Sequence, residues 1–412
     1  MYKKIISFLL CLAFAFFLTS CSDDENLVVA KVNGESIYYS EYQKSLSDYL
    51  YNNYGMIESR MDDSFGEENS NKIREMIVDE LISQKLLKKQ AKELGLTKFT
   101  SEQKSTIEKN REDFLADLKE QCESEVQKSN EKKDITMSKE EFDEAVLEKY
   151  NKYVENKGYT QEYLYNYYWD ELTLSVLREY VFDGLTVTDT EVEDYYNEEL
   201  ANQQSIAQES NITALDNYFS NAYDINLYIP EGINRVKHVY IALPDDILSQ
   251  TTTSSTDETK ALLAEELAKI KPEAQEVLNL LKQGKDFDEV IDEYGDDEDM
   301  LDEDVKENGY EISLVSSDKP TELQIAANKL KNPGDISELI ETKYGYYILK
   351  LVRKTSAGPV DFKTVKDDIK TLIENSKKAE LWDNNLEELK SKAEIEKFTD
   401  NYIPPTTEEL MQ

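Results

Sequence analysis

The sequence predicts an α+β protein whose N-terminal half is mostly helical and whose C-terminal half contains a compact domain of strands and helices. Between Ser70 and Leu94, apolar residues recur at a spacing of four and form one broad face, which is typical of a buried helix. Residues 236–243 and 344–352 are strand-like and enclose several helical segments, an order that favours a compact α+β domain. Helical spacing resumes at Asp361 and predicts a long C-terminal helix.

The first element after the N-terminal apolar run is predicted to be a β-hairpin. Val28 to Val32 alternates and is rich in β-branched residues. Asn33-Gly34 follows, the strongest short signal for a two-residue hairpin turn. Ser36-Ile37-Tyr38 then forms the returning strand.

Helix starts are predicted where Ser or Thr precedes Glu or Gln by three residues, because the two side chains then cap each other's backbone N–H groups. The pairs with this spacing are Ser40–Gln43, Thr100–Gln103, Ser138–Glu141 and Thr188–Glu191. Residues 104–133 are highly charged and predict a protruding or mobile helix. Residues 202–226 are polar, lack a pattern and predict a linker or loop.

Within the α+β domain, the strand 236–243 is followed by a Ser/Thr-rich loop at 249–257. We expect a helix interrupted at Pro272, two shorter helices, and a final strand entered through Gly345. The tail after Phe398 contains Pro404-Pro405 and predicts disorder.

The chain begins with Lys3, Lys4 and an apolar run that ends at Leu18. This run is shorter than the roughly 20 residues of a bilayer span, so it is typical of a secretory signal. Leu18-Thr19-Ser20-Cys21 resembles the lipobox of bacterial lipoproteins, which implies acylation of Cys21; an ordinary signal is the alternative. Cys11 would leave with the signal, so only Cys122 remains and no internal disulfide is expected.

The composition excludes several classes of function. The chain has 47 Lys+Arg against 86 Asp+Glu and a net charge of −39, which argues against nucleic-acid binding and against spreading on anionic lipid. His238 is the single histidine, so a zinc site is not expected. The run Asp296 to Asp299 lacks the spacing of a calcium loop and predicts a solvated loop. We expect no metal and no cofactor.

Five segments together resemble the extracytoplasmic foldases of the SurA and PrsA type. "VVAKVNGESIYYSEYQ" and "LTVTDTEVEDYYNEE" are similar to the helical chaperone domain of that family. "VKHVYIALP", "LLKQGKDFDEVIDEYGDD" and "NKLKNPGDISELIETKYGYYILKLV" resemble a parvulin-type peptidyl-prolyl isomerase domain. The resemblance implies a signal peptide at 1–20, an anchor linker at 21–27, a helical chaperone domain at 28–226 and an inserted parvulin-like domain at 233–354. A helix at 361–398 would pack back on the chaperone domain, before a disordered tail at 399–412.

The resemblance also implies where the isomerase site would lie. Parvulins generally have two buried histidines, a nearby Asp or Cys, and a pocket lined by Met and Phe. His238 matches the first histidine, Tyr347 stands at the second, and Tyr310 stands at the acidic position.

The implied proline pocket also departs from the family pattern. Leu323 stands at the pocket phenylalanine and about Lys319 at the pocket methionine. Tyr346, beside Tyr347, is a further candidate substrate-binding residue. The alternative is that His238 is a core histidine with no catalytic role.

The predicted function is that of a membrane-anchored, extracytoplasmic foldase that binds newly secreted unfolded polypeptides. An isomerase must lower a barrier of about 18–20 kcal/mol set by amide resonance, and the departures from the family pattern predict weak catalysis. A holdase with an inactive isomerase domain is one alternative, and a solute-binding or adhesive lipoprotein is another. A homodimer is left open. The tyrosines near residues 163–168 are core residues or, in part, an exposed client surface.

Overall fold

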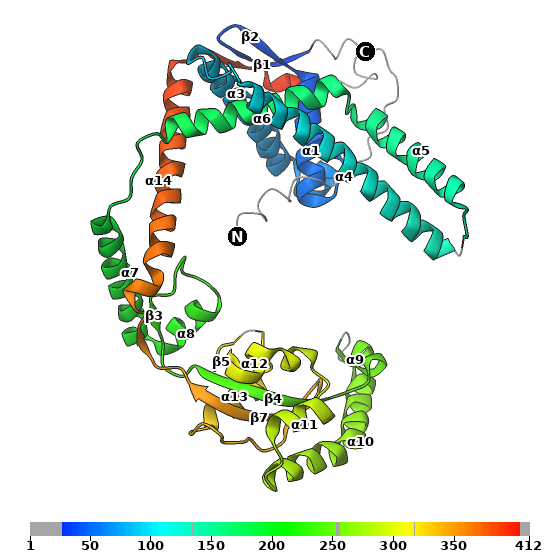
Figure 1. The fold of residues 1–412 in the computed structure, drawn as a ribbon, viewed down its shortest axis with the longest axis vertical. Coiled ribbons are helices and arrows are strands. Elements are labelled where there is room, and N and C mark those ends of the chain that lie inside the picture. The colour runs from blue at the N-terminus through cyan, green and yellow to red at the C-terminus, as the bar shows by residue number, and fades with distance from the viewer. Residues whose placement is uncertain (1–26, 134, 253–255, 317, 404–412) are drawn as a thin grey trace. The chain divides into compact units, whose positions relative to one another are not determined.

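The computed structural model describes residues 27–133, 135–252, 256–316 and 318–403 (Figure 1). The chain divides into two compact units. The helical unit comprises the residues up to Leu185 and those from Lys377 onward, and the second unit runs from Thr186 to Ser376. The predicted α+β class is confirmed, with helices in the majority and a small antiparallel sheet in the second unit.

Long helices make up most of the helical unit, and local capping fixes several of their starts. The predicted pairs Thr100–Gln103 and Ser138–Glu141 both form reciprocal hydrogen bonds. The first helix begins at Tyr39, one residue before the predicted cap Ser40. The bounds are α1 (Tyr39–Tyr54), α2 (Met61–Phe65), α3 (Glu67–Glu93), α4 (Ser101–Lys133), α5 (Lys139–Lys157) and α6 (Gln161–Val181).

A three-stranded antiparallel sheet joins the two ends of the chain within the helical unit. β1 (Val28–Val32) lies between β2 (Glu35–Tyr38) and β9 (Ile395–Lys397). The predicted hairpin is confirmed, because Asn33 and Gly34 both have positive φ, at 51° and 82°. The buried side of β1 packs with α1 and α3 in one hydrophobic core.

The tail prediction is wrong for residues 399–403, which are ordered against this core. Tyr402 is 4% exposed and its ring stacks on that of Tyr42, with centroids 5.6 Å apart. Asn401 donates from its side chain to the carbonyl of Val28 at 2.7 Å. Contacts with the other end of the chain therefore order this segment, and tail composition does not reveal them. Residues 404–412 lie outside the described residues.

The second unit begins with helices where a loop was predicted. α7 (Asp189–Glu209) and α8 (Asn211–Phe219) cover most of 202–226, so that prediction is wrong. The Gln203 side chain explains part of the difference, because its oxygen accepts from the backbone N–H groups of Leu227 and Tyr228 at 2.8 and 3.0 Å. Residues 186–226 thus belong to the second unit, although we expected them in the helical domain.

One long helix, α14 (Phe362–Lys392), contributes to both units. In the second unit, Val365 and Ile369 pack with Val192 of α7, beside the short strands β3 (Tyr228–Ile229) and β8 (Gly358–Pro359). In the helical unit, Trp382 and Leu386 pack around Leu177 of α6 and Leu87 and Ala91 of α3. The helical unit is therefore completed from the C-terminal end of the chain.

The α+β domain, residues 233–354, has a four-stranded antiparallel sheet in the order β5-β4-β7-β6. One face packs with α10 and α11, and the other is covered by α13. The strands are β4 (Asn234–Ala242), β5 (Tyr310–Ile312), β6 (Ile340–Thr342) and β7 (Gly345–Lys354). The helices are α9 (Asp245–Thr252), α10 (Asp257–Lys282), α11 (Phe287–Tyr294), α12 (Glu303–Asn308) and α13 (Thr321–Lys329).

Two local predictions for this domain differ from the structure. α10 continues through Pro272, where an interruption was predicted. α9 occupies the first part of the segment predicted as a Ser/Thr-rich loop, and residues 253–255 of that segment lie outside the description. Among the described residues, no helix combines the length and the hydropathy needed to cross a bilayer. The predicted signal and the acylated Cys21 fall outside the described residues.

Candidate functional site

The candidate site lies on the face of the α+β sheet that α13 covers. In the antiparallel pair of β4 and β7, Tyr240 is opposite Tyr347 and His238 is opposite Leu349. Because side chains alternate along a strand, His238, Tyr240 and Tyr347 all project from this one face. The central pair of strands therefore brings the single histidine and two tyrosines together.

Two glycines allow the neighbouring backbone to approach β4 closely enough to form the site. Gly345, at the start of β7, has φ 145°, and a Cβ there would lie 2.2 Å from the carbonyl oxygen of Ile241. Gly309 has φ 66°, and a Cβ there would lie 2.8 Å from the carbonyl oxygen of Val236. A side chain at either position would force the backbones apart, so both glycines help to place the tyrosines that follow them.

His238 has a hydrogen-bond partner at each ring nitrogen. Its Nε2 lies 2.9 Å from Oδ2 of Asp297, and its Nδ1 lies 3.0 Å from the hydroxyl of Tyr310. In the neutral imidazole that fits these contacts, Nε2–H donates to the carboxylate and Nδ1 accepts from the phenol. His238 is only 5% exposed, so its imidazole ring is sheltered from water.

Tyr347 completes the cluster through its ring. This ring lies 5.2 Å from the His238 ring in an edge-on arrangement and stacks on Tyr240 at 4.3 Å. The Tyr240 hydroxyl donates to the carbonyl of Tyr344 at 2.9 Å. Ring packing thus links Tyr347 and Tyr240 to the hydrogen-bonded group of His238, Asp297 and Tyr310.

The surroundings set the protonation states of the cluster. The hydrogen bond from His238 holds the pKa of Asp297 below its usual range, against the opposing effect of burial. Burial raises the pKa of Tyr310, and it also raises that of Tyr347. At neutral pH the site therefore contains one carboxylate and neutral phenols.

The structure brings three of the predicted catalytic residues together, namely His238, Tyr310 and Tyr347. Leu323 lies on the same side of the sheet, where it is 1% exposed in the core beneath α13. Tyr346 does not belong to the site: it faces the opposite core and donates to Glu341 at 2.6 Å. The reason is the strand alternation, which places neighbouring residues on opposite faces.

Two residues of the cluster were missed by the sequence analysis. Asp297 supplies the acidic partner that we had placed at Tyr310, and the run that contains it was predicted to be a solvated loop. Tyr240 stacks on Tyr347. The alternation of β4 could have revealed Tyr240, which lies two residues after His238. The position of Asp297 depends on a loop held to β4, where Asp296 accepts from the N–H of Ala242 at 2.8 Å.

Twisting an X-Pro amide requires a dry apolar pocket and hydrogen-bond donors aimed at the amide. The ring nitrogens of His238 both have partners, Tyr347 is buried, and Tyr310 is partly buried. Lys319 lies at the expected position of the pocket methionine, with its Nζ 5.0 Å from the centre of the Tyr310 ring. While these two contacts hold, the His238 imidazole therefore has neither a ring N–H nor a ring lone pair left for a substrate.

Comparisons with known proteins agree with this architecture. Residues 2–126 match the SurA-like N-terminal domain, and residues 247–353 match the PPIC-type peptidyl-prolyl isomerase (rotamase) domain. The chain thus combines the two domain types of PrsA- and SurA-type foldases. It is 25% identical over 409 residues to the foldase protein PrsA of Clostridium kluyveri, covering 95% of this chain and 96% of that protein.

Further foldase and chaperone proteins align over similar lengths. The foldase protein PrsA of Clostridium botulinum strain Langeland is 24% identical, with 97% of this chain and 99% of that protein covered. PrsA from Bacillus subtilis is 17% identical, with 92% and 100% coverage and a TM-score of 0.20. A solved structure from work on SurA-like chaperones of Campylobacter jejuni is 11% identical, with 90% and 99% coverage and a TM-score of 0.31.

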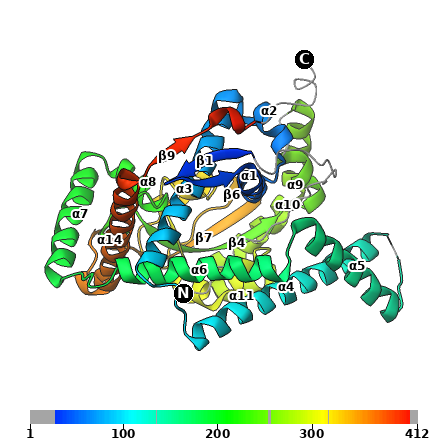
Figure 2. The same cartoon turned by 90° about the horizontal axis from the view of Figure 1, so that it is seen from above.

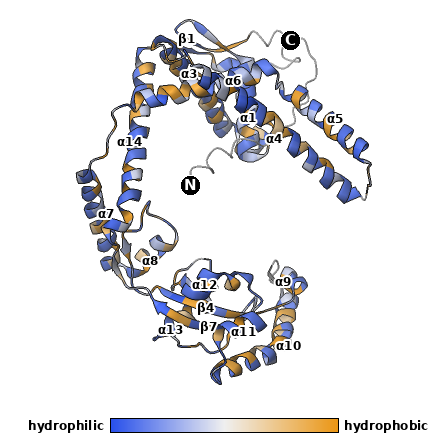
Figure 3. Ribbon diagram, viewed as in Figure 1, coloured by the Kyte–Doolittle hydropathy of each residue, from blue (hydrophilic) through white to orange (hydrophobic). Residues whose placement is uncertain are grey.

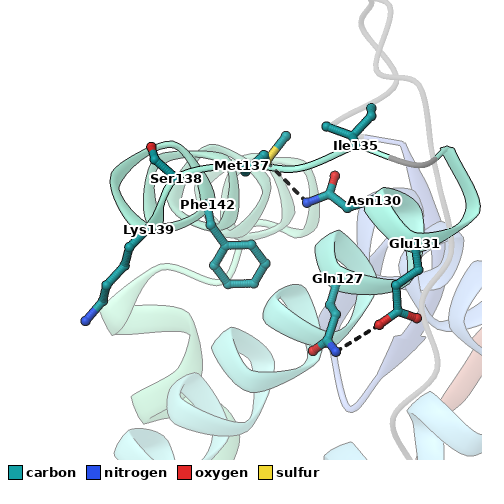
Figure 4. Close-up of a pocket in the computed structure, with 8 residues that line it drawn as sticks. All are labelled: Gln127, Asn130, Glu131, Ile135, Met137, Ser138, Lys139 and Phe142. Carbon is teal, nitrogen blue, oxygen red and sulfur yellow. Dashed lines mark hydrogen bonds between the residues drawn. The ribbon is translucent and has the colours of Figure 1, made fainter.

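A separate hollow lies in the helical unit, where α4 and α5 meet. Figure 4 shows Phe142 of α5 pointing into the space between the helices, opposite Gln127 of α4. Ile135 and Met137, on the connecting segment, are 45% and 36% exposed. The lining of this hollow mixes apolar, amide and charged side chains. This mixture does not indicate one class of ligand.

Proposed function

We propose that this protein is an extracytoplasmic foldase that binds unfolded polypeptides and whose α+β domain accelerates X-Pro isomerisation weakly or not at all. The family and the printed names of its relatives support the foldase part of the proposal. The observation that carries the second part is the pairing of both ring nitrogens of His238 with Asp297 and Tyr310. PrsA foldases are extracytoplasmic, which agrees with the N-terminal segment that resembles a secretory signal.

A foldase with little catalysis still has a physical role. Uncatalysed isomerisation takes tens of seconds or longer, and an exposed chain can aggregate in that time. Weak, reversible binding of the unfolded chain by the helical unit protects it during this delay without ATP. In this view, the α+β domain acts mainly as a scaffold or binds proline-containing segments.

The proposal includes a lipid anchor at Cys21, supported by the resemblance of Leu18-Thr19-Ser20-Cys21 to a lipobox. A Cys21→Ala variant should accumulate as precursor or be released, as followed by membrane fractionation. Normal processing and unchanged membrane association of this variant would exclude the anchor.

The experiment for the catalytic part compares wild-type protein with Tyr347→His in a proline-peptide isomerisation assay. Wild-type protein should accelerate isomerisation little, and Tyr347→His should raise the rate because it restores the second histidine of the family pattern. Acid–base and hydrogen-bond effects contribute about 10²–10⁴-fold in favourable cases, which is the upper range for the gain. The double variant Tyr347→His/Tyr310→Asp covers the case in which Tyr310 blocks the site.

Aggregation suppression is measured on the same samples. His238→Ala should remove any residual isomerisation but leave the suppression of aggregation nearly unchanged. Strong wild-type catalysis that requires His238 would overturn the closed-site part of the proposal and show that Tyr347 replaces the histidine. Failure to suppress aggregation in every sample would overturn the foldase part.

A further inference from the structure

The helical unit carries an exposed patch in which tyrosines and carboxylates are mixed. The patch, called here the tyrosine–carboxylate surface, consists of Tyr167, Tyr168 and Glu171 on α6 and Asp113 and Asp117 on α4. Helices α4 and α6 are packed together (Figure 2). Aromatic rings link each helix to the residue just before the other helix. The ring centres of Phe114 on α4 and Tyr159 are 5.1 Å apart, and those of Phe99 and Trp169 on α6 are 4.6 Å apart. The two sides of the surface are therefore fixed to each other.

The aromatic part of this surface is open to solvent. Tyr167 is 43% exposed, and its ring meets that of the half-buried Tyr168 edge-on at 5.1 Å. Along α4 and α5, hydrophilic residues predominate (Figure 3). The tyrosines of α6 therefore provide apolar area beside a charged helix.

The acidic part of this surface consists of three carboxylates on two neighbouring helices. Asp113, Asp117 and Glu171 are exposed, and none of them forms an ion pair with a described residue. Burial raises the pKa of Tyr168, and the next contributions come from Asp117, Asp113 and Glu171 in that order. All three carboxylates are thus within electrostatic reach of one phenol ring.

The same unit shows how such a combination holds a cation. Lys44 places its Nζ 4.9 Å from the centre of the Tyr163 ring and 3.5 Å from a carboxylate oxygen of Asp48. A cation over an aromatic face is attracted by the ring quadrupole, and a nearby carboxylate adds a charge contact. The tyrosine–carboxylate surface has the same two kinds of group without the cation.

We propose that the tyrosine–carboxylate surface binds lysine- or arginine-containing segments of unfolded polypeptides. This inference rests on the proposed foldase function and names the class of client segment that the helical unit selects. The ring faces contact the alkyl stems and the cationic heads, and the carboxylates pair with the heads. The net charge of −39 raises the local concentration of cationic chains around the protein.

Other occupants fit this surface less well. A purely apolar segment would shield the carboxylates from water without providing partners for them, which is unfavourable. An acidic segment would be repelled. A second copy of this chain also carries a large negative charge, so it would need a local basic patch to bind here.

The test uses the full chain and three fluorescent peptides that differ at four positions only. The peptides have about 15 residues, equal apolar content, and Lys, Gln or Glu at the four variable positions. Fluorescence anisotropy should show about tenfold tighter binding of the Lys peptide than of the Gln peptide at low salt, with the Glu peptide weakest. The preference should shrink at high salt, because exposed charges are screened.

The patch variant is Asp113→Asn/Asp117→Asn/Glu171→Gln, which keeps the side-chain shapes. It should bind the Lys peptide about tenfold more weakly, since each exposed charge contact contributes a factor of about 1.4–5, and should bind the Gln peptide unchanged. The matched control Asp143→Asn/Glu144→Gln/Glu148→Gln removes three exposed charges from α5. It should keep its affinity for the Lys peptide within about twofold.

The outcomes separate this inference from the foldase proposal. If wild-type protein binds the Lys and Gln peptides equally, or if patch and control variants lose affinity equally, the surface does not select cations. A change of oligomeric state in the patch variant, seen by analytical ultracentrifugation, would instead assign the surface to contacts between copies and overturn the inference. Failure to bind any of the peptides or an unfolded protein would overturn the foldase function itself.

Discussion

The tyrosines around His238 and the tyrosines on α6 have the same chemistry but different surroundings. Around His238, Tyr347 is buried and Tyr310 is partly buried, and the Tyr310 hydroxyl bonds to the imidazole. On α6, Tyr167 is 43% exposed and stands near carboxylates that form no ion pair with a described residue. The first set of tyrosines packs into the His238 cluster, whereas the second remains accessible to a ligand.

Under the proposed function, this difference explains how one chain can resemble an enzyme in one domain and bind polypeptides through another. A buried polar network is stable when all of its members are paired. A network that satisfies itself in this way has nothing to offer a substrate. The surface of α6 and α4 has the opposite property, because its exposed carboxylates form no ion pair with a described residue. Three substitutions test whether hydrogen-bond pairing, rather than burial alone, makes a buried polar side chain stabilising.

The largest effect is expected from His238→Ala, which removes the centre of the closed cluster. It would leave the Asp297 carboxylate and the Tyr310 hydroxyl without their partner, at a cost of about 3 kcal/mol in the stability of the α+β domain. Hydrogen-exchange mass spectrometry of β4 and β7 measures this loss. Both tryptophans, Trp169 and Trp382, belong to the helical unit, so the fluorescence transition is an internal control that should not move. Unchanged exchange would show that the cluster is not a stabilising network.

A smaller effect is expected from Tyr310→Phe. This change keeps the ring packed edge-on against His238 but removes the hydroxyl that bonds to Nδ1. The stability of the α+β domain should fall by about 1 kcal/mol, the usual contribution of one hydrogen bond, again read from exchange in β4. A loss as large as that of His238→Ala would mean that the ring position, and not the hydrogen bond, determines the stability.

The smallest effect is expected from Tyr42→Phe in the helical unit. The hydroxyl of Tyr42 is buried, but it has no hydrogen-bond partner among the described residues, and the ring stacks on Tyr402. Its removal should change the stability of the helical unit by less than about 0.5 kcal/mol or raise it, because an unpaired buried hydroxyl is unfavourable. Denaturant titration followed by tryptophan fluorescence measures the change. A loss of 1 kcal/mol or more would show that burial without pairing is equally stabilising, and the comparison would fail.

Features that depend on a few adjacent residues could be predicted from the sequence. The turn at Asn33-Gly34 and the caps at Ser138 and Thr188 occur as expected, because each is determined within a span of four residues. The class of the fold followed from apolar spacing that repeats along each helix. The order of segments that resemble the foldase family also led to the correct relatives.

The sequence by itself determined the class of the fold, the types of most helices and strands, and the foldases to which the chain is related. Only the tertiary structure decided which residues meet His238, because Asp297 and Tyr310 are 59 and 72 residues away along the chain. The pairing register of β4 and β7 decided that Tyr347 faces the site and that Tyr346 faces away, since a shift of one residue reverses every side chain of a strand. Local spacing fixes a backbone conformation, whereas contact between distant residues depends on how the elements pack.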